Sequence, residues 1–302
     1  MLDPLPIPPW LRDSAEPLTN LLHLHTLTLH VHEVLLSFAV YSFINDVLAP
    51  HISAWLIPTR YAKFPRRTRL QWNIHVTSFV NATFLSFAAP YVLSADKDLL
   101  INTWEERLWG YTGACGMVQA FGVGYFLWDL KVCILNFELL GVIDLVHAMV
   151  AVIITTLGYR PFGLYYGIQY AFIELSTPFV NIHWFLNKLD RAGSNLQIIN
   201  GVVLIITFAC CRLIFGCYLA VVFFRDVWTA LHSPHMSWTE YNYSPTEKPL
   251  VLQHQAVWWV AAIFMITHAI VMSLSAFWFI KMIMTVRKHI NSSSGRSKVR
   301  HD

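Results

Sequence analysis

Residues 198–224 read IINGVVLIITFACCRLIFGCYLAVVFF, and Arg212 is the one formally charged side chain among them. A helix needs about 20 predominantly apolar residues to cross the hydrocarbon core of a bilayer. The stretch has 27 residues, and an apolar run of this length is typical of a transmembrane helix rather than of a buried helix in a soluble domain. The stretch therefore predicts a membrane span.

Six other stretches have the same character. With the first, they lie at residues 21–48, 72–93, 108–130, 139–157, 162–186, 198–224 and 256–286. Hydrocarbon offers backbone groups no hydrogen-bond partner, so each span must be a helix that satisfies its own N–H and C=O groups. Charged residues make up 13% of the chain, against about 25% in soluble domains. The sequence predicts an all-α polytopic membrane protein with about seven transmembrane helices.

Lysine and arginine follow an alternating pattern in the connections between spans. One side of the membrane receives Arg60, Lys63, Arg66, Arg67, Arg69, Lys131, Lys188, Arg191 and the basic C-terminal tail. Cytosolic loops carry such an excess of basic residues, so we expect a cytosolic C-terminus and a lumenal N-terminus. The basic first loop is expected to meet anionic lipid headgroups. The net charge of +3 gives no indication of nucleic-acid binding, because the basic residues lie at membrane edges.

The termini and one long connection complete the organisation of the chain. Residues 1–20 are expected to form a lumenal tail without a cleavable signal peptide, since acids and prolines open it. Residues 21–62 are expected to hold the first transmembrane helix and the start of the basic cytosolic loop. Residues 225–255 form a predicted lumenal loop, and the basic, serine-rich residues 289–302 are predicted to be a disordered cytosolic tail.

Several ionisable residues fall inside the predicted spans, where a charge costs about 2.5–3.5 kcal/mol on insertion scales and marks a functional site by default. Asp144 and His147 are three residues apart, so on a helix they share a face and can hydrogen-bond. A carboxylate in that position fixes the imidazole tautomer and raises its basicity, as a general base requires. The alternative is that the pair only holds helices together.

Arg212 lies near the middle of its span, too deep to reach water by extending along the helix. It requires an acidic partner, and Asp129, Asp144 and Glu174 are the candidates. Either a structural ion pair or an anion-binding role would explain a charged side chain at this depth in the membrane.

The histidines near the lumenal start of the first span are better explained by their interfacial position than by metal binding, since no carboxylate pattern in the sequence completes a site. We therefore expect neither a metal site nor a bound cofactor.

Four motifs resemble the TLC-domain family in order and spacing. They are QWNIHVTS at residues 71–78, GYFLWD at 124–129, DLVH at 144–147 and ELSTPFVNIHWFL at 174–186. The resemblance covers about residues 63–288, which we assign as the TLC domain. It points to the small TLC-domain transmembrane proteins of vertebrates and fungi rather than to the ceramide synthases.

This resemblance implies a helical bundle around a lipid-accessible cavity, usually in the endoplasmic reticulum membrane, with a role in lipid metabolism or homeostasis. Ceramide synthases, the enzymatic branch, transfer an acyl chain from acyl-CoA to a sphingoid amine with a histidine pair. Here His147 is followed by Ala148, and Asn81 stands where many relatives have histidine. Both departures weaken the expectation of ceramide synthase activity.

Two functions remain for such a chain. One is an acyltransferase-like enzyme in which His147 is base or acyl acceptor, Asp144 and Asp129 orient it, and acyl-CoA is the co-substrate. The other is a non-catalytic lipid-binding or membrane-composition regulator. A transporter is a third reading, for which no inverted repeat gives support. The residues expected to bind substrate are Arg212, Glu174, His75, His183 and Trp128. The expected partners are membrane lipids, a fatty acyl chain and, as an open alternative, a second copy of the chain in a homodimer.

Overall fold

The computed structural model describes residues 3–99, 101–160, 162–233, 250–251 and 258–298, with side chains as far as Arg287. Helices account for nearly all of this part of the chain. Two strands of two residues each, β1 (Gly110–Tyr111) and β2 (Leu250–Val251), pair antiparallel with Gly110 opposite Val251.

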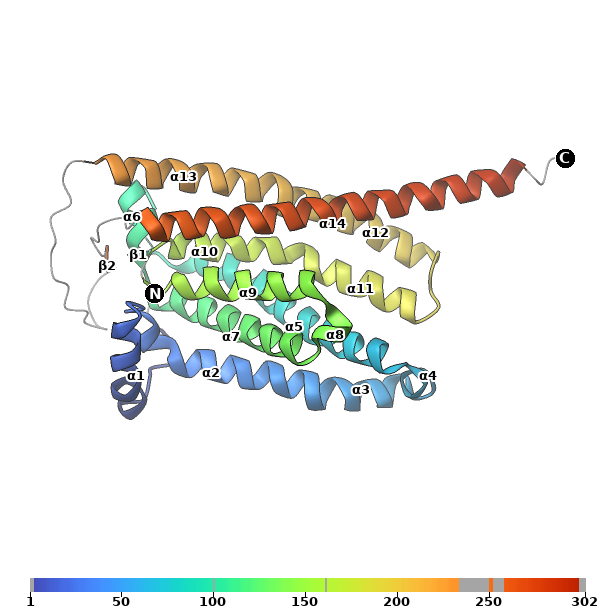
Figure 1. The fold of residues 1–302 in the computed structure, drawn as a ribbon, viewed down its shortest axis with the longest axis horizontal. Coiled ribbons are helices and arrows are strands. Elements are labelled where there is room, and N and C mark those ends of the chain that lie inside the picture. The colour runs from blue at the N-terminus through green and yellow to red at the C-terminus, as the bar shows by residue number, and fades with distance from the viewer. Residues whose placement is uncertain (1–2, 100, 161, 234–249, 252–257, 299–302) are drawn as a thin grey trace.

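The chain runs back and forth along the long axis of the molecule in a bundle of roughly parallel traverses (Figure 1). Four traverses are single helices: α5 (Arg66–Ala95), α7 (Gly113–Leu135), α9 (Val142–Leu157) and α14 (Trp258–Lys298). Two contain a π-helical turn: α2 (Leu27–Phe43) continues through η1 (Ile44–Leu48) into α3 (Ala49–Leu56), and α12 (Asn195–Phe208) continues through η3 (Ala209–Phe215) into α13 (Gly216–His232). One contains a 3₁₀ helix, since α10 (Leu164–Tyr170) continues through η2 (Ala171–Ser176) into α11 (Thr177–Lys188). Short helices α1 (Pro9–Leu21), α4 (Pro58–Lys63), α6 (Trp104–Trp109) and α8 (Phe137–Leu140) lie at the ends.

Five of these traverses are long and apolar enough to cross a membrane, namely Leu27–Leu56, Arg66–Ala95, Gly113–Leu135, Asn195–His232 and Trp258–Arg287, and Val142–Leu157 is a shorter apolar helix. Large apolar side chains on the outside of the bundle, among them Trp55, Phe87, Ile214 and Val221, are exposed, as expected of residues that face lipid. The predicted all-α polytopic membrane fold is confirmed.

The bounds of the predicted spans differ from those of the structure, and three of the differences have a clear physical cause. The first begins at Leu27, not at residue 21, because α1 ends at Leu21 and the chain then turns through His23 at a φ of 55°. The third begins at Gly113, where the Thr112 side chain caps the helix by accepting from the Cys115 N–H. The fifth is interrupted by η2, since Pro178 starts a new helix at α11.

The last helix continues through residues 289–298, where the composition predicted disorder. No proline interrupts this stretch, so a helix that enters it from the bundle has nothing to end it sharply. The assignment of residues 63–288 as one domain, with flanking segments, stays a prediction.

Glycines in α7 allow α2 to pack closely against it. A Cβ at Gly116 would overlap the imidazole of His30, and a Cβ at Gly124 would overlap the hydroxyl of Ser37. Small residues let helix backbones approach closely inside a membrane, where no hydrophobic effect drives helix association. The close packing of α2 on α7 therefore depends on glycine at positions 116 and 124.

An arginine–aspartate ion pair joins neighbouring elements at each end of the bundle. One end, here called the basic end, carries α4, α8 and the connection after α11 (Figure 1), and Arg60 Nη1 there lies 2.8 Å from Asp190 Oδ2. At the opposite end, called the N-terminal end, Arg107 Nε of α6 lies 2.6 Å from Asp226 Oδ2 of α13. That carboxylate also raises the pKa of Arg107 above its ordinary value, so the pair stays charged across the physiological range.

Candidate functional site

Arg212 is held by three side chains of the ELSTPF motif. Its Nε donates to Ser176 Oγ at 3.0 Å, and its Nη2 donates to Thr177 Oγ1 at 2.9 Å and to Glu174 Oε1 at 3.5 Å. The arginine is 8% exposed. Of the three acids proposed as its partner, Glu174 is the one that the structure selects.

Unusual helical turns bring together Arg212 and its three partners Glu174, Ser176 and Thr177, here called the clamp. Glu174 and Ser176 lie in the 3₁₀ helix η2, Thr177 opens α11, and Arg212 lies in the π-helical turn η3. π-Helical turns occur frequently at functional sites, because the wider turn re-aims side chains that an α-helix would hold elsewhere. Sequence reasoning identified the motif but not the roles of Ser176 and Thr177, whose hydroxyls bind the guanidinium.

His147 lies beside this clamp. Its Nδ1 is buried without a hydrogen-bond partner among the described residues, and its ring packs edge-on against Trp278 of α14 with 5.5 Å between centroids. The imidazole interacts electrostatically with Arg212 and Glu174. A buried ring nitrogen without a hydrogen-bond partner lowers the stability of the fold. This nitrogen is available to bind a substrate.

The expected hydrogen bond between Asp144 and His147 is absent. Asp144 is exposed in the first turn of α9, and its electrostatic partner is Arg67 at the basic end. Helical spacing placed the two residues on one face, but the Asp144 carboxylate makes no hydrogen bond to His147 and interacts with Arg67 instead. Asp144 therefore extends the charged site toward the basic end rather than orienting the imidazole.

Asp129 joins the site from α7. It interacts electrostatically with Asp144 and Glu174, so the three carboxylates lie near one another, and Glu174 is the one of them that binds Arg212. Next to it, Tyr125 faces Ser78 of α5. Tyr41 donates to Asn81 Oδ1 at 2.9 Å, while the buried Asn81 Nδ2 has no partner among the described residues. Sequence reasoning missed both tyrosines. The signal that could have pointed to this face is the pair Ser78 and Asn81, which are three residues apart and so share a face of α5.

Of the other three predicted site residues, His75 and His183 make contacts outside the clamp, and Trp128 packs on the site residue Tyr125. His75 Nδ1 lies 2.6 Å from Asn181 Oδ1, and its ring stacks on Trp184 at 4.2 Å, so it joins α5 to α11. His183 lies against Gly201 of α12. Trp128 is fully buried and packs 5.4 Å from the Tyr125 ring, in the core between α2 and α7.

The sequence profile of the TLC domain matches residues 71–284, which include the clamp, His147 and Asp129. The chain belongs to the TLC-domain family. It is similar to an uncharacterised TLC domain-containing protein of Schizosaccharomyces pombe, with 34% identity over 92% of this chain and 86% of the relative. It is also similar to topoisomerase I damage affected protein 4 of Saccharomyces cerevisiae, with 27% identity over 66% of this chain and 71% of that protein. TLC domain-containing protein 4 of Homo sapiens is 24% identical over 60% of this chain and 70% of its own length. The family is linked to lipid metabolism or homeostasis.

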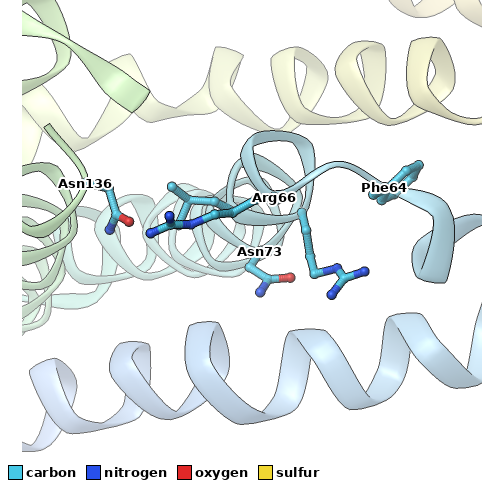
Figure 2. A pocket seen from close by; sticks show the side chains of 6 residues that line it. Phe64, Arg66, Asn73 and Asn136 are labelled. Carbon is cyan, nitrogen blue, oxygen red and sulfur yellow. The ribbon is translucent and has the colours of Figure 1, made fainter. Parts of the chain in front are cut away.

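A pocket of about 420 Å³ opens near the basic end, where the TLC domain begins. Figure 2 shows Arg66 and Asn73 between Asn136 on one side and Phe64 on the other. Arg69 also lines this pocket and donates to the Ala62 carbonyl at 3.1 Å. Phe64 and Leu70 supply an apolar part of the lining, and the two arginines and two amides supply a cationic, polar part that suits a phosphate group.

A second pocket, of about 410 Å³, has a mostly apolar lining. Leu93, Phe172, Cys211 and Phe215 contribute to it. Phe172 and Cys211 belong to η2 and η3, the two turns that also hold Glu174 and Arg212. A hydrocarbon chain in this pocket would lie against the elements of the clamp.

Proposed function

We propose that this TLC-domain protein acts on membrane lipids in the endoplasmic reticulum membrane, with its C-terminus cytosolic, and transfers an acyl group by means of His147. The buried, unpartnered Nδ1 of His147 beside Glu174 and Arg212 supports the proposal most directly. An imidazole that had only a structural role would have its nitrogens hydrogen-bonded, because an unmet buried polar atom costs about 1–3 kcal/mol.

The chemistry follows from the groups around the imidazole. A His147 nitrogen attacks the carbonyl carbon of an acyl thioester, and the carbon–sulfur bond breaks to release a thiolate. The acyl-imidazole then passes the acyl group to a lipid amine or hydroxyl, whose proton goes to the released thiolate. In each step negative charge develops on the carbonyl oxygen, and the Arg212 guanidinium, held in place by Ser176 and Thr177, would stabilise it.

The two pockets suit the two parts of such a donor. The apolar pocket beside η2 and η3 suits an acyl chain, and the cationic pocket at Arg66 and Arg69 suits the phosphates of acyl-CoA or an anionic lipid headgroup. Asp144 and Arg67 extend the charged site in the direction of the basic end.

Substitution of His147 tests the catalytic step. Cells that express the wild type, His147→Ala or His51→Ala at equal protein level are compared by lipidomics, with a deletion strain as reference. His51 is an exposed histidine and serves as the matched control. We expect His147→Ala to resemble the deletion and His51→Ala to resemble the wild type. Intact-mass spectrometry of purified protein given acyl-CoA should show an acyl adduct that His147→Ala lacks.

A non-catalytic lipid-binding regulator is the second candidate. Two observations favour it. Asp144 is exposed and does not orient His147. The residue after His147 is the fully buried Ala148, so the histidine pair of the ceramide synthases is not present. Under this alternative, His147→Ala would restore the wild-type lipid profile to the deletion strain, and no acyl adduct would form.

A further inference from the structure

A second buried ionisable cluster lies at the N-terminal end of the bundle, away from the clamp. Its members are Asp3 from the segment before α1 and His30 and Glu33 from α2. His30 Nδ1 lies 2.6 Å from Glu33 Oε2 and 3.4 Å from Asp3 Oδ2. His30 and Glu33 are both fully buried. The sequence showed no carboxylate pattern around these histidines, and the fold supplies two carboxylates.

Among the described residues, no lysine or arginine is an electrostatic partner of the two carboxyl groups. The electrostatic partners of Asp3 and Glu33 are each other and the two histidines at positions 30 and 32. Glu33 Oε1 is buried and has no hydrogen-bond partner among the described residues. Buried carboxyl groups of this kind are neutralised by a proton or by a cation, since isolated buried charges are strongly unfavourable.

The surrounding groups fix the three side chains as ligands. Tyr111 OH lies 2.6 Å from His30 Nε2 and the ring of Tyr159 stacks on the imidazole. In the metal-free protein Nδ1 shares a proton with Glu33 Oε2 at 2.6 Å. A metal ion would replace that proton, with Nε2 then donating to Tyr111 OH, which is the arrangement found around histidines that bind metals. Asp3 Oδ1 accepts from the Leu5 N–H at 2.8 Å, so Oδ2 is the oxygen that faces His30.

Two glycines at the start of α7 make room for the cluster. A Cβ at Gly116 would overlap the His30 ring, and a Cβ at Gly113 would overlap the backbone and Cβ of Asp3. The segment that carries Asp3 is also attached to α2, because His32 Nε2 lies 2.6 Å from the Leu5 carbonyl oxygen. The fold therefore accommodates the three donors closely instead of leaving Asp3 on a free tail.

We propose that Asp3, His30 and Glu33 bind a divalent metal ion, with zinc the best match, and that the ion fastens the N-terminal segment to α2. One nitrogen and two carboxylate oxygens suit zinc, with water in the fourth position. The ligand atoms lie within 4.8 Å of one another, and a tetrahedral zinc site separates its ligands by roughly 3.3 Å. The free Glu33 Oε1 is the oxygen placed to become the ligand.

Metal analysis of the purified full-length protein tests the site. The protein in detergent is stripped with a chelator, dialysed against Zn²⁺ and measured by elemental analysis. We expect the wild type to bind one equivalent more than Glu33→Gln, and Asp3→Asn to bind that equivalent with at least about tenfold lower affinity. Asp13→Asn, which removes an exposed carboxylate of α1, should match the wild type. Zinc should also slow proteolysis of the N-terminal segment in the wild type but not in Asp3→Asn.

Two results would overturn the proposal. Equal zinc binding by the wild type, Asp3→Asn and Glu33→Gln would mean that protons neutralise the cluster and that any zinc lies at other histidines. Stoichiometric binding of Ca²⁺ with no binding of Zn²⁺ would exclude His30 as a ligand, since Ca²⁺ prefers oxygen donors. Asp3 lies outside the helices, so its variant keeps the test valid even if Glu33→Gln does not fold.

Discussion

Arg212 Nε donates to Ser176 Oγ at 3.0 Å, across 36 residues of sequence. This bond joins the π-helical turn of one traverse to the 3₁₀ turn of another. Both turns depart from α-helical geometry where they meet. The π-helical turn supplies the guanidinium, and the 3₁₀ turn supplies the hydroxyl and the carboxylate that bind it. A charged side chain inside the membrane is thereby satisfied by protein groups, as its environment requires.

Substitution of Arg212 should expose its pairing with Glu174. Arg212→Met leaves the Glu174 carboxylate without its guanidinium, and removing one partner of a buried pair costs about 3–5 kcal/mol. Arg212→Met combined with Glu174→Gln should recover much of this loss. Arg212→Met combined with Asp144→Asn should recover none, because Asp144 is exposed and makes no ion pair with Arg212. Thermal unfolding in detergent provides the measurement. Equal recovery in both double variants would contradict the assignment of Glu174.

Glycines of α7 allow a matched comparison of packing. Gly116→Ala should lower the unfolding temperature strongly, because its methyl group overlaps the fully buried His30 ring, which has no room to move. Gly122→Ala, two turns along the same helix, meets nothing within 4 Å and should be neutral or stabilise by up to about 1 kcal/mol. Indistinguishable melting curves for the two variants would show that α2 and α7 are not packed as described.

Hydropathy was sufficient to predict the fold class, because a bilayer constrains every span to be apolar and helical. It could not predict the break at His23, where a positive φ turns the chain within an apolar stretch. Nor could it predict that the fifth span is divided by η2, since alanine, phenylalanine and isoleucine there are equally compatible with an α-helix.

The sequence predicted which residues belong to the site but not which of them contact one another. Burial cost identified Arg212 and three acids, yet the choice of Glu174 depends on how α12 and α13 pack against η2. The spacing of Asp144 and His147 fixed their shared face but not the direction of the carboxylate. Asp3 could not be connected with His30 at all, because the contact depends on how the segment before α1 folds back over α2.

Arg66 should contribute to binding an anionic group in the basic pocket. Arg66→Gln should lower the affinity for an anionic phospholipid or for acyl-CoA, since each basic residue near such a group contributes about 1 kcal/mol. Arg60→Gln is the matched control, because Arg60 lies at the same end but is paired with Asp190. Lipid retention by native mass spectrometry distinguishes the two sources of phosphate. Equal retention by both variants would contradict a role for this pocket.

The arrangement of the bundle also predicts which connections face the cytosol. The first loop and the connection after α11 meet at the basic end through Arg60 and Asp190, and the positive-inside rule assigns this end to the cytosol. The natural sequon Asn242-Tyr243-Ser244 lies outside the described residues and precedes Pro245, which disfavours glycosylation. An efficient sequon engineered between α13 and α14 should therefore be glycosylated in microsomes, whereas one engineered beside Arg66 should not, because only the lumen contains the glycosylation machinery. Glycosylation beside Arg66 alone would invert the orientation and place the cationic pocket on the lumenal side.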